Sequence, residues 1–362
     1  MLRVLLVRPH NQGKGGVANY YRAVEPYLDD HEIRIFAFEI GSFKKKFLNF
    51  HPVIDQLRFF RKIKIPFDLV HVNPSLGWKS FFRDGLFIWQ AKRRGLKVLV
   101  FFRGWDIGFA AIVSRYFRWF FRITFARADK FIVLASDFER QLRHWGVNQP
   151  IELGTTLVDD RLLRNFNCQN KLLRLRQTRQ IKILYLARLE KDKGVYEVID
   201  AVRLLVIKGL DVSLAIAGDG ALLSDLRVYI DSLGLSNECI TLLGYVTGDA
   251  KIKIFSDSDI YCLPSYYGEG LPNSVLEAMA FAMPVITTSV GGLADFFQDG
   301  RMGYIVQPKN SEEIACAVES LINDREKMVK IAEYNHEYAC AHLLAPKVAS
   351  FLKNNYKLVI ES

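Results

Sequence analysis

The chain has 362 residues, of which 50% are apolar and 24% are charged, and its formal net charge is +10. This apolar fraction excludes a disordered chain, and the five cysteines and 24 glycines exclude a disulfide scaffold and a collagen-like repeat. The length predicts two domains, or one large domain, with packed cores.

The positive charge is confined to the first part of the chain. Residues 1–165 carry 28 Lys and Arg against 15 Asp and Glu, whereas residues 166–362 carry 21 against 24. A basic half of this kind indicates contact with a nucleic acid, an anionic membrane surface or a polyanionic substrate.

The cysteines are widely spaced and form no Cys-x-x-Cys pattern, which is typical of reduced thiols in a cytoplasmic protein. The apolar run after Met1 ends at Arg8, and no uninterrupted apolar stretch reaches about 18 residues. The sequence therefore predicts no signal peptide and no membrane span. We expect a cytoplasmic protein whose contact with the inner face of the cell membrane is peripheral.

Short apolar runs alternate with amphipathic stretches along the whole chain, which predicts parallel sheets covered by helices on both faces. In the first half we expect strands at 4–7, 33–38, 69–72, 98–102 and 131–134, with helices at 22–28 and 82–91. In the second half we expect strands at 181–186, 213–217, 241–243, 260–263, 285–288 and 303–306, with helices at 194–206, 221–233 and 274–282.

The segment 161–180 is polar and reads as irregular, so the domain boundary is placed there. The predicted fold class is α/β, with two Rossmann-like, doubly wound domains at residues 1–165 and 166–345. Residues 346–362 are predicted to form an amphipathic C-terminal helix, which can return to the first domain.

The densest motif spans residues 264–280, at the predicted end of a strand. The chain turns through Gly268 and Gly270 and then enters a helix, with Pro272 near its first position and Asn273 or Ser274 as the cap. Backbone amides of such glycines beside a positive helix end bind phosphate.

Two carboxylates flank this turn, Glu269 on the loop and Glu277 on the helix, and both can accept hydrogen bonds from sugar hydroxyls. The alternative is a capped helix with two surface glutamates. The spacing of the two glutamates, with Gly268, Gly270 and Leu271 around them, resembles retaining GT-B glycosyltransferases of family 4, the glycosyl transferases group 1.

This resemblance implies a GT-B fold, in which two domains face a deep cleft, and a nucleoside diphosphate sugar as donor, UDP- or GDP-linked. It implies no metal and no separate cofactor. Glu277 is implied to bind the ribose and Glu269 the transferred sugar, while Gly268, Gly270 and Leu271 contact the donor.

Other segments resemble the family in the same order along the chain. Arg188 and Lys193 match the cations that neutralise the donor diphosphate, although Lys191 is an alternative and a solvated loop would have the same composition. Gly218 matches the turn beneath the nucleotide, and Gly244 matches the segment that borders the base.

In the first half, Gly15 and Gly16 resemble the family loop whose amides approach the donor phosphate. Arg103 stands where the family often has a histidine, and arginine can hold a phosphate or an anionic sugar but cannot act as a base. Asp106 is the nearest carboxylate and a candidate contact for the acceptor hydroxyl. His71 either faces the cleft or ends its strand without a role in binding.

Asp257 and Asp259 form an Asp-x-Asp pair that we interpret as a surface turn.

Basic residues interleave with aromatic residues at 43–67 and 115–125, and at helical spacing Arg115, Arg118 and Arg122 share a face. Such helices suit an anionic headgroup layer. The alternative is a solvated basic face, and no nucleic-acid-binding module matches.

The predicted function is retaining, metal-independent transfer of a sugar to an acceptor hydroxyl. The expected acceptor is a saccharide, in particular a lipid-linked oligosaccharide in surface polysaccharide synthesis. One alternative is a non-catalytic subunit that binds sugar nucleotides. A second, an NAD-dependent oxidoreductase, is disfavoured because the glycine turns lack the dinucleotide fingerprint.

Overall fold

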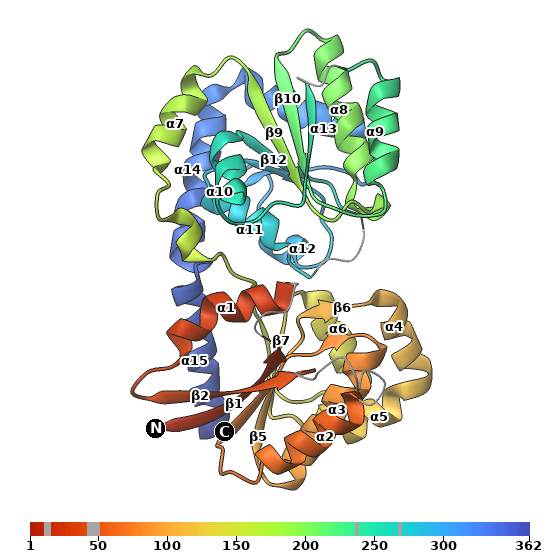
Figure 1. Cartoon of the computed structure of the whole chain (residues 1–362), viewed down its shortest axis with the longest axis vertical. Coiled ribbons are helices and arrows are strands. Elements are labelled where there is room, and N and C mark those ends of the chain that lie inside the picture. The colour runs from red at the N-terminus through yellow and green to blue at the C-terminus, as the bar shows by residue number, and fades with distance from the viewer. Residues whose placement is uncertain (11–15, 42–50, 236–238, 267–269) are drawn as a thin grey trace. The chain divides into compact units, whose positions relative to one another are not determined.

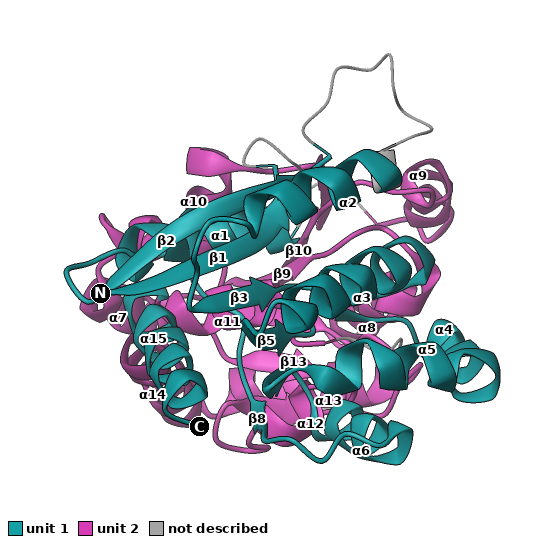
Figure 2. Ribbon diagram, turned by 90° about the horizontal axis from the view of Figure 1, so that it is seen from below, with its two compact units in different colours: residues 1–159, 345–362 teal, residues 160–344 magenta. Residues whose placement is uncertain are grey.

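The structure is a computed structural model of the chain, coloured along its length in Figure 1. The chain forms two compact units, distinguished by colour in Figure 2: unit 1 comprises residues 1–159 and 345–362, and unit 2 comprises residues 160–344. The residues that the structure describes are 1–10, 16–41, 51–235, 239–266 and 270–362.

Unit 1 is built on a six-stranded parallel sheet of order β2-β1-β3-β5-β7-β8. Its strands are β1 (Leu2–Pro9), β2 (Ile33–Ile40), β3 (Leu69–Val72), β5 (Lys97–Phe101), β7 (Lys130–Val133) and β8 (Ile151–Leu153). Two short strands, β4 (Ser75–Leu76) and β6 (Gly104–Trp105), pair with each other after β3 and β5. Strands β3 and β7 are buried along their whole length, as expected for a sheet covered on both faces.

The helices of unit 1 lie on both faces of this sheet (Figure 1). They are α1 (Gly16–Leu28), α2 (His51–Lys62), α3 (Trp78–Arg93), α4 (Ile107–Ile112), α5 (Arg118–Ile123), α6 (Ser136–Trp145) and α15 (Ala345–Glu361). The C-terminal helix α15 packs against α1 and β5. At its exposed edge, Lys353 Nζ lies 2.7 Å from a carboxylate oxygen of Asp30.

Unit 2 repeats the arrangement with a six-stranded parallel sheet of order β11-β10-β9-β12-β13-β14. Its strands are β9 (Ile181–Leu186), β10 (Val212–Ala217), β11 (Ile240–Gly244), β12 (Ile260–Leu263), β13 (Val285–Thr287) and β14 (Gly303–Ile305). Its helices are α7 (Cys168–Gln177), α8 (Val195–Ile207), α9 (Leu223–Ser232), α10 (Gly248–Asp257), α11 (Asn273–Ala280), α12 (Leu293–Phe296), α13 (Ser311–Asn323) and α14 (Arg325–His342).

Both units thus have the Rossmann-like α/β architecture that the alternation of apolar runs predicted. The division after residue 159 precedes the boundary that the sequence placed after residue 165, and the last helix belongs to unit 1. None of the described helices combines the length and apolar character needed to cross a bilayer.

The prediction of an irregular segment at 161–180 was wrong for residues 168–177, which form helix α7. The side chain of Asn167 caps the helix by accepting a hydrogen bond from the Asn170 amide, and Leu172 and Leu175 are buried. The helix is therefore set by its cap and by a short apolar face, although its composition is polar.

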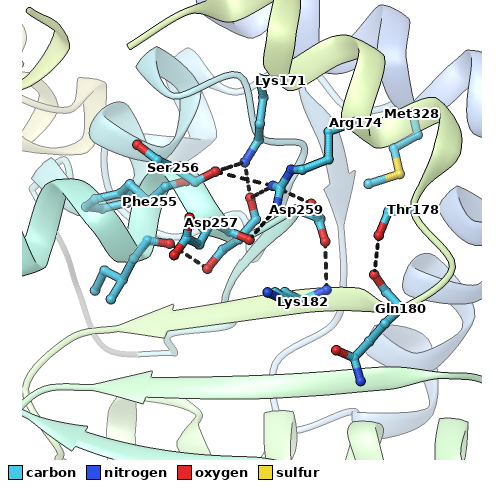
Figure 3. Close-up of polar contacts among 12 residues, drawn as sticks. Lys171, Arg174, Thr178, Gln180, Lys182, Phe255, Ser256, Asp257, Asp259 and Met328 are labelled. Atoms are coloured by element: carbon cyan, nitrogen blue, oxygen red, sulfur yellow. Dashed lines mark hydrogen bonds and ion pairs between the residues drawn. The ribbon is translucent and has the colours of Figure 1, made fainter. Parts of the chain in front are cut away.

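Two cations on α7 hold the end of α10 (Figure 3). The Lys171 ammonium donates to the carbonyl oxygens of Ser256 (2.9 Å) and Ser258, and burial lowers the pKa of Lys171. The Arg174 guanidinium donates to the carbonyl oxygen of Asp257 at 2.8 Å. Cations at a helix C-terminus satisfy carbonyls that have no partner within the helix.

Asp259 belongs to the same network, so its prediction as a surface residue was wrong. The residue is buried, and its two carboxylate oxygens accept from Arg174 Nη2 at 2.7 Å and from the Lys182 amide at 2.8 Å. Asp257 instead lies at the surface, 3.2 Å from Lys253. The two acidic residues of the pair thus have different surroundings.

The three arginines that were predicted to share a face, Arg115, Arg118 and Arg122, differ in exposure. Arg118 is half-buried and donates to the carbonyl oxygen of His144 at 2.9 Å. A π-helical turn at Val113–Phe117 contains Arg115, so this residue lies outside the regular helix α5 that carries Arg118 and Arg122. Arg115 and Arg122 are exposed.

The two members of the Asp-x-Asp pair provide a matched test. Asp259→Asn places an amide N–H₂ against a donor, so we expect the free energy of unfolding to fall by about 2 kcal/mol. Asp257→Asn disrupts an exposed ion pair and should change it by less than about 0.5 kcal/mol. Urea denaturation of the full chain measures both values, and equal losses would contradict a structural role specific to Asp259.

Candidate active site

The loops that follow β9 and β10 pack backbone against backbone at the carboxyl edge of the unit 2 sheet. Gly218 has a φ of +153°, and a Cβ there would overlap the carbonyl oxygen of Ala187. A Cβ on Gly220 would lie 2.5 Å from the carbonyl oxygen of Leu189. Glycine is required at both positions because only it allows this approach.

The loop after β9 also contacts the loop after β12. Gly194 has a φ of +75°, and a Cβ on it would lie 2.5 Å from the carbonyl oxygen of Pro264. The carbonyl oxygen of Asp192 accepts hydrogen bonds from the Tyr266 amide (3.0 Å) and the Ser265 hydroxyl (3.2 Å). The structure thus brings together two motifs that the sequence singled out about 70 residues apart.

The two predicted diphosphate ligands both lie on the loop after β9, in different surroundings. Arg188 has 74% of its side chain exposed and pairs with Glu190 at 2.7 Å. Lys193 is buried, and its carbonyl oxygen accepts a hydrogen bond from the Tyr185 hydroxyl at 3.3 Å. Lys191, the alternative to Lys193, is exposed.

Glu277 is buried on the second turn of α11 and pairs with Lys251 of α10 at 2.7 Å. Sequence reasoning missed Lys251, because nothing in the spacing of residues on α10 indicates a partner on another helix. The expected cap was wrong: Pro272 occupies the N-cap position, and no side chain caps α11. The amides of its first turn are therefore not satisfied by a capping side chain.

The remaining donor residues of unit 2 lie on the same edge of the sheet. The Gly218 amide donates to the carbonyl oxygen of Gly244 at 2.8 Å, which links the loops after β10 and β11. The carbonyl oxygen of Gly270 accepts from the Gly292 amide at 2.6 Å, and Leu271 is buried. Gly268 and Glu269 lie outside the described residues, so their predicted roles stay predictions.

Four predicted positions lie in unit 1. Gly15 is outside the described residues, and Gly16 begins α1. Asp106 is the N-cap of α4, where its carboxylate accepts from the Phe109 amide at 2.9 Å. Capping of α4 is sufficient to explain an acidic residue at position 106. The contact of Asp106 with the acceptor hydroxyl stays a prediction.

The fourth position, Arg103, follows β5 and lies beside a buried polar cluster. His71 Nδ1 is 2.8 Å from the Tyr356 hydroxyl of α15, and burial lowers the pKa of His71 to about 3. His71 is therefore neutral at physiological pH and is held by the C-terminal helix.

The edge of the unit 2 sheet combines exposed backbone turns, two cations and a buried carboxylate. Such a set can bind a phosphorylated ligand that also carries hydroxyl groups. Within the described part of the chain, no group of three or more His, Cys, Asp or Glu side chains is arranged to hold a metal ion.

Two family models match the chain. Residues 3–153 match the glycosyl transferase 4-like domain, and residues 174–338 match glycosyl transferases group 1. The chain therefore consists of a glycosyl transferase 4-like domain and a glycosyl transferases group 1 domain, which confirms the resemblance to glycosyl transferases group 1 seen in the sequence.

Solved structures match the fold over the whole chain. HepE of Anabaena, in complex with UDP and glucose, has a TM-score of 0.74 at 17% identity and covers 99% of this chain and 100% of its own. A glycosyltransferase from Rickettsia africae has a TM-score of 0.75 at 17% identity and covers 100% of this chain and 99% of its own. The GT-B fold that the resemblance implied is thereby confirmed.

Curated relatives match over part of their length. The alpha-D-kanosaminyltransferase of Streptomyces kanamyceticus is 34% identical over 42% of this chain and 39% of its own. The capsular polysaccharide biosynthesis glycosyltransferase CapM of Staphylococcus aureus is 31% identical over 39% of this chain and 36% of its own. The chain thus spans less than half the length of these relatives.

The glycines at the strand ends give a graded prediction. Gly218→Ala forces a side chain against the Ala187 carbonyl in a strained conformation, so we expect a loss of about 3 kcal/mol. Gly244→Ala has the same positive sign of φ but open space around it, and should cost about 1 kcal/mol. Thermal unfolding of both variants measures the two losses of stability. A larger loss for Gly244→Ala than for Gly218→Ala would refute the close contact of Gly218 with the Ala187 carbonyl.

Proposed function

We propose that this protein transfers a sugar from a nucleoside diphosphate sugar, UDP- or GDP-linked, to an acceptor hydroxyl. The observation that carries the proposal is the packing of the loops after β9, β10 and β12 against one another in unit 2. Ligands of parallel α/β sheets bind at the carboxyl ends of the strands, where these loops lie.

The charges on the loop after β9 suit a diphosphate. The ion pair of Arg188 with Glu190 is exposed and contributes at most about 1 kcal/mol, so a phosphate can replace the carboxylate at little cost. Lys193 is held on a short 3₁₀ turn beside the loop after β12. Two cations stabilise the negative charge that grows on the diphosphate as the glycosidic bond breaks.

Glu277 is the proposed ligand of the ribose hydroxyls. Its ion pair with Lys251 orients the carboxylate, and an ionised carboxylate accepts more than one hydrogen bond. Glu269 is the proposed contact of the transferred sugar. Anabaena HepE was solved with UDP and with UDP-glucose, which supports a nucleotide sugar as ligand.

We further propose that the reaction is retaining and metal-independent, with the departing diphosphate assisting attack on the same face of the sugar. The proposed acceptor is a lipid-linked oligosaccharide in polysaccharide synthesis. Relatives named for capsular polysaccharide, colanic acid and teichuronic acid biosynthesis support this class of acceptor.

Single substitutions on the loop after β9 test whether Arg188 and Lys193 stabilise the leaving group. Lys193→Ala and Arg188→Ala should each lower turnover by about 10²-fold or more, because each removes a charge that stabilises the leaving group. Lys191→Ala is the matched comparison, because Lys191 is the exposed alternative to Lys193. It should retain wild-type turnover, and a loss in Lys191→Ala but not in Lys193→Ala would move the role to Lys191.

The measurement is release of nucleoside diphosphate from a panel of UDP- and GDP-sugars with saccharide acceptors, and NMR of the product reads its anomeric configuration. Calorimetry with UDP and GDP measures binding separately. Binding of a nucleotide without any sugar transfer would favour a non-catalytic subunit, and no binding in the wild type would refute the proposal.

Membrane attachment through unit 1 is the second part of the proposal. On α2, Val53, Leu57 and Phe60 form an exposed apolar stripe at spacings of four and three residues. On the segment from α4 to α5, Tyr116 and Trp119 are exposed beside Arg115 and Arg122. Aromatic groups flanked by cations fit the interface of an anionic bilayer.

Vesicle binding tests the membrane surface. Wild-type protein should cosediment with vesicles of phosphatidylglycerol and phosphatidylcholine, and release with salt because screening weakens the attraction. Replacing Tyr116 and Trp119 by Ser should weaken binding by about tenfold or more. Ile207→Ser is the control, an equally exposed apolar residue in the acidic unit 2. Binding indifferent to salt, lipid charge and both aromatic residues would contradict this surface.

A further inference from the structure

Arg103 lies at the carboxyl edge of the unit 1 sheet, between two buried aromatic rings. Its guanidinium carbon is 3.6 Å from the centroid of the Tyr20 ring and 4.5 Å from that of Phe101. Tyr20 comes from α1 and Phe101 ends β5, and both are almost fully buried. The rings fix the plane of the guanidinium and leave its N–H donors to be satisfied by other groups.

Only some of those donors meet a described residue, because Arg103 interacts with the Tyr20 side chain. Nε and Nη1 of Arg103 are buried and have no hydrogen-bond partner in the described part of the chain, and no described carboxylate forms an ion pair with this residue. Burial lowers the pKa of Arg103, but a guanidinium remains charged in proteins. A buried charge without a counter-ion is costly, so its retention calls for a ligand.

The described side chains around Arg103 supply no negative charge. His71 Nε2 is also buried without a hydrogen-bond partner among the described residues, and the Tyr20 hydroxyl interacts with Arg103 itself. Burial raises the pKa of Tyr20 to about 12, and His71 is neutral, so neither can act as the counter-ion. Asn73 is occupied by the Tyr21 hydroxyl and by the carbonyl oxygen of Val7.

Arg103 as a whole residue is only partly buried, although its Nε and Nη1 atoms are buried. We propose that Arg103 binds an oxyanion of the substrate, with Tyr20 and Phe101 holding the guanidinium in place. The oxyanion is a phosphate or a carboxylate. The inference rests on the proposed function only for the identity of the molecule that carries this group.

The test measures thermal unfolding and calorimetric binding with inorganic phosphate and with glucuronate. Titrations are made with saturating UDP, which occupies the proposed nucleotide site in unit 2, and sodium chloride and glucose serve as matched controls. The proteins are the wild type, Arg103→Met, Arg103→Lys and Arg127→Met, the last removing an exposed arginine of the same unit.

We expect at least one of the two anions to stabilise the wild type and Arg127→Met, and neither to stabilise Arg103→Met. Arg103→Lys keeps the charge without the planar donor set and should bind at least about tenfold more weakly. Without anions, Arg103→Met should unfold at or above the wild-type temperature, because it removes an uncompensated charge.

A response to phosphate alone identifies a phosphorylated substrate, and a response to glucuronate alone identifies an acidic sugar. Equal responses of the wild type and Arg103→Met, or no response of the wild type, overturn the inference. Destabilisation of both Arg103 variants without anions would instead make Arg103 a structural partner of the two rings. UDP affinity reports separately on the proposed function, because Arg103 lies outside unit 2.

Discussion

The arrangement of the unit 2 site depends on the close approach of backbones at the carboxyl edge of its sheet. Gly218 and Gly220 lie against the carbonyls of Ala187 and Leu189, and Gly194 lies against that of Pro264. Any side chain at these glycines would push the loops apart. The position of Arg188 and Lys193 relative to the loop after β12 therefore depends on three missing Cβ atoms more than on contacts of the charged residues themselves.

The same edge of the unit 1 sheet is organised differently, by aromatic rings around buried polar groups. His71, Tyr20 and Arg103 are packed among rings, and the Tyr356 hydroxyl of α15 reaches His71. Since α15 supplies part of this packing, the last residues of the chain stabilise the edge where the strands of unit 1 end. A polar network of this kind is favourable only when its hydrogen-bond donors are satisfied. Among the described residues, Nε and Nη1 of Arg103 have no hydrogen-bond partner.

The sequence predicted the architecture well because buried parallel strands have short, continuous apolar sequences. Residues 69–72, 181–186 and 260–263 were predicted as strands with the bounds that the structure has. Helix α7 was missed because its composition is polar and because Lys171 and Arg174 hold the end of α10, in contacts between segments about 80 residues apart. Its Asn167 cap, in contrast, is a local feature. Helical spacing also did not indicate the π-helical turn that contains Arg115.

The candidate site shows the same division between local and long-range information. Motif spacing singled out Gly218, Lys193 and Glu277 as candidates, because glycine turns and charged residues in short motifs are local features, and their roles stay predictions. Spacing could not supply Lys251, which pairs with Glu277 across two helices, nor the burial of Asp259. For Arg103, the sequence supplied only the residue type. The structure adds that Arg103 has no counter-ion among the described residues, and this lack of compensation is the reason to assign it a ligand.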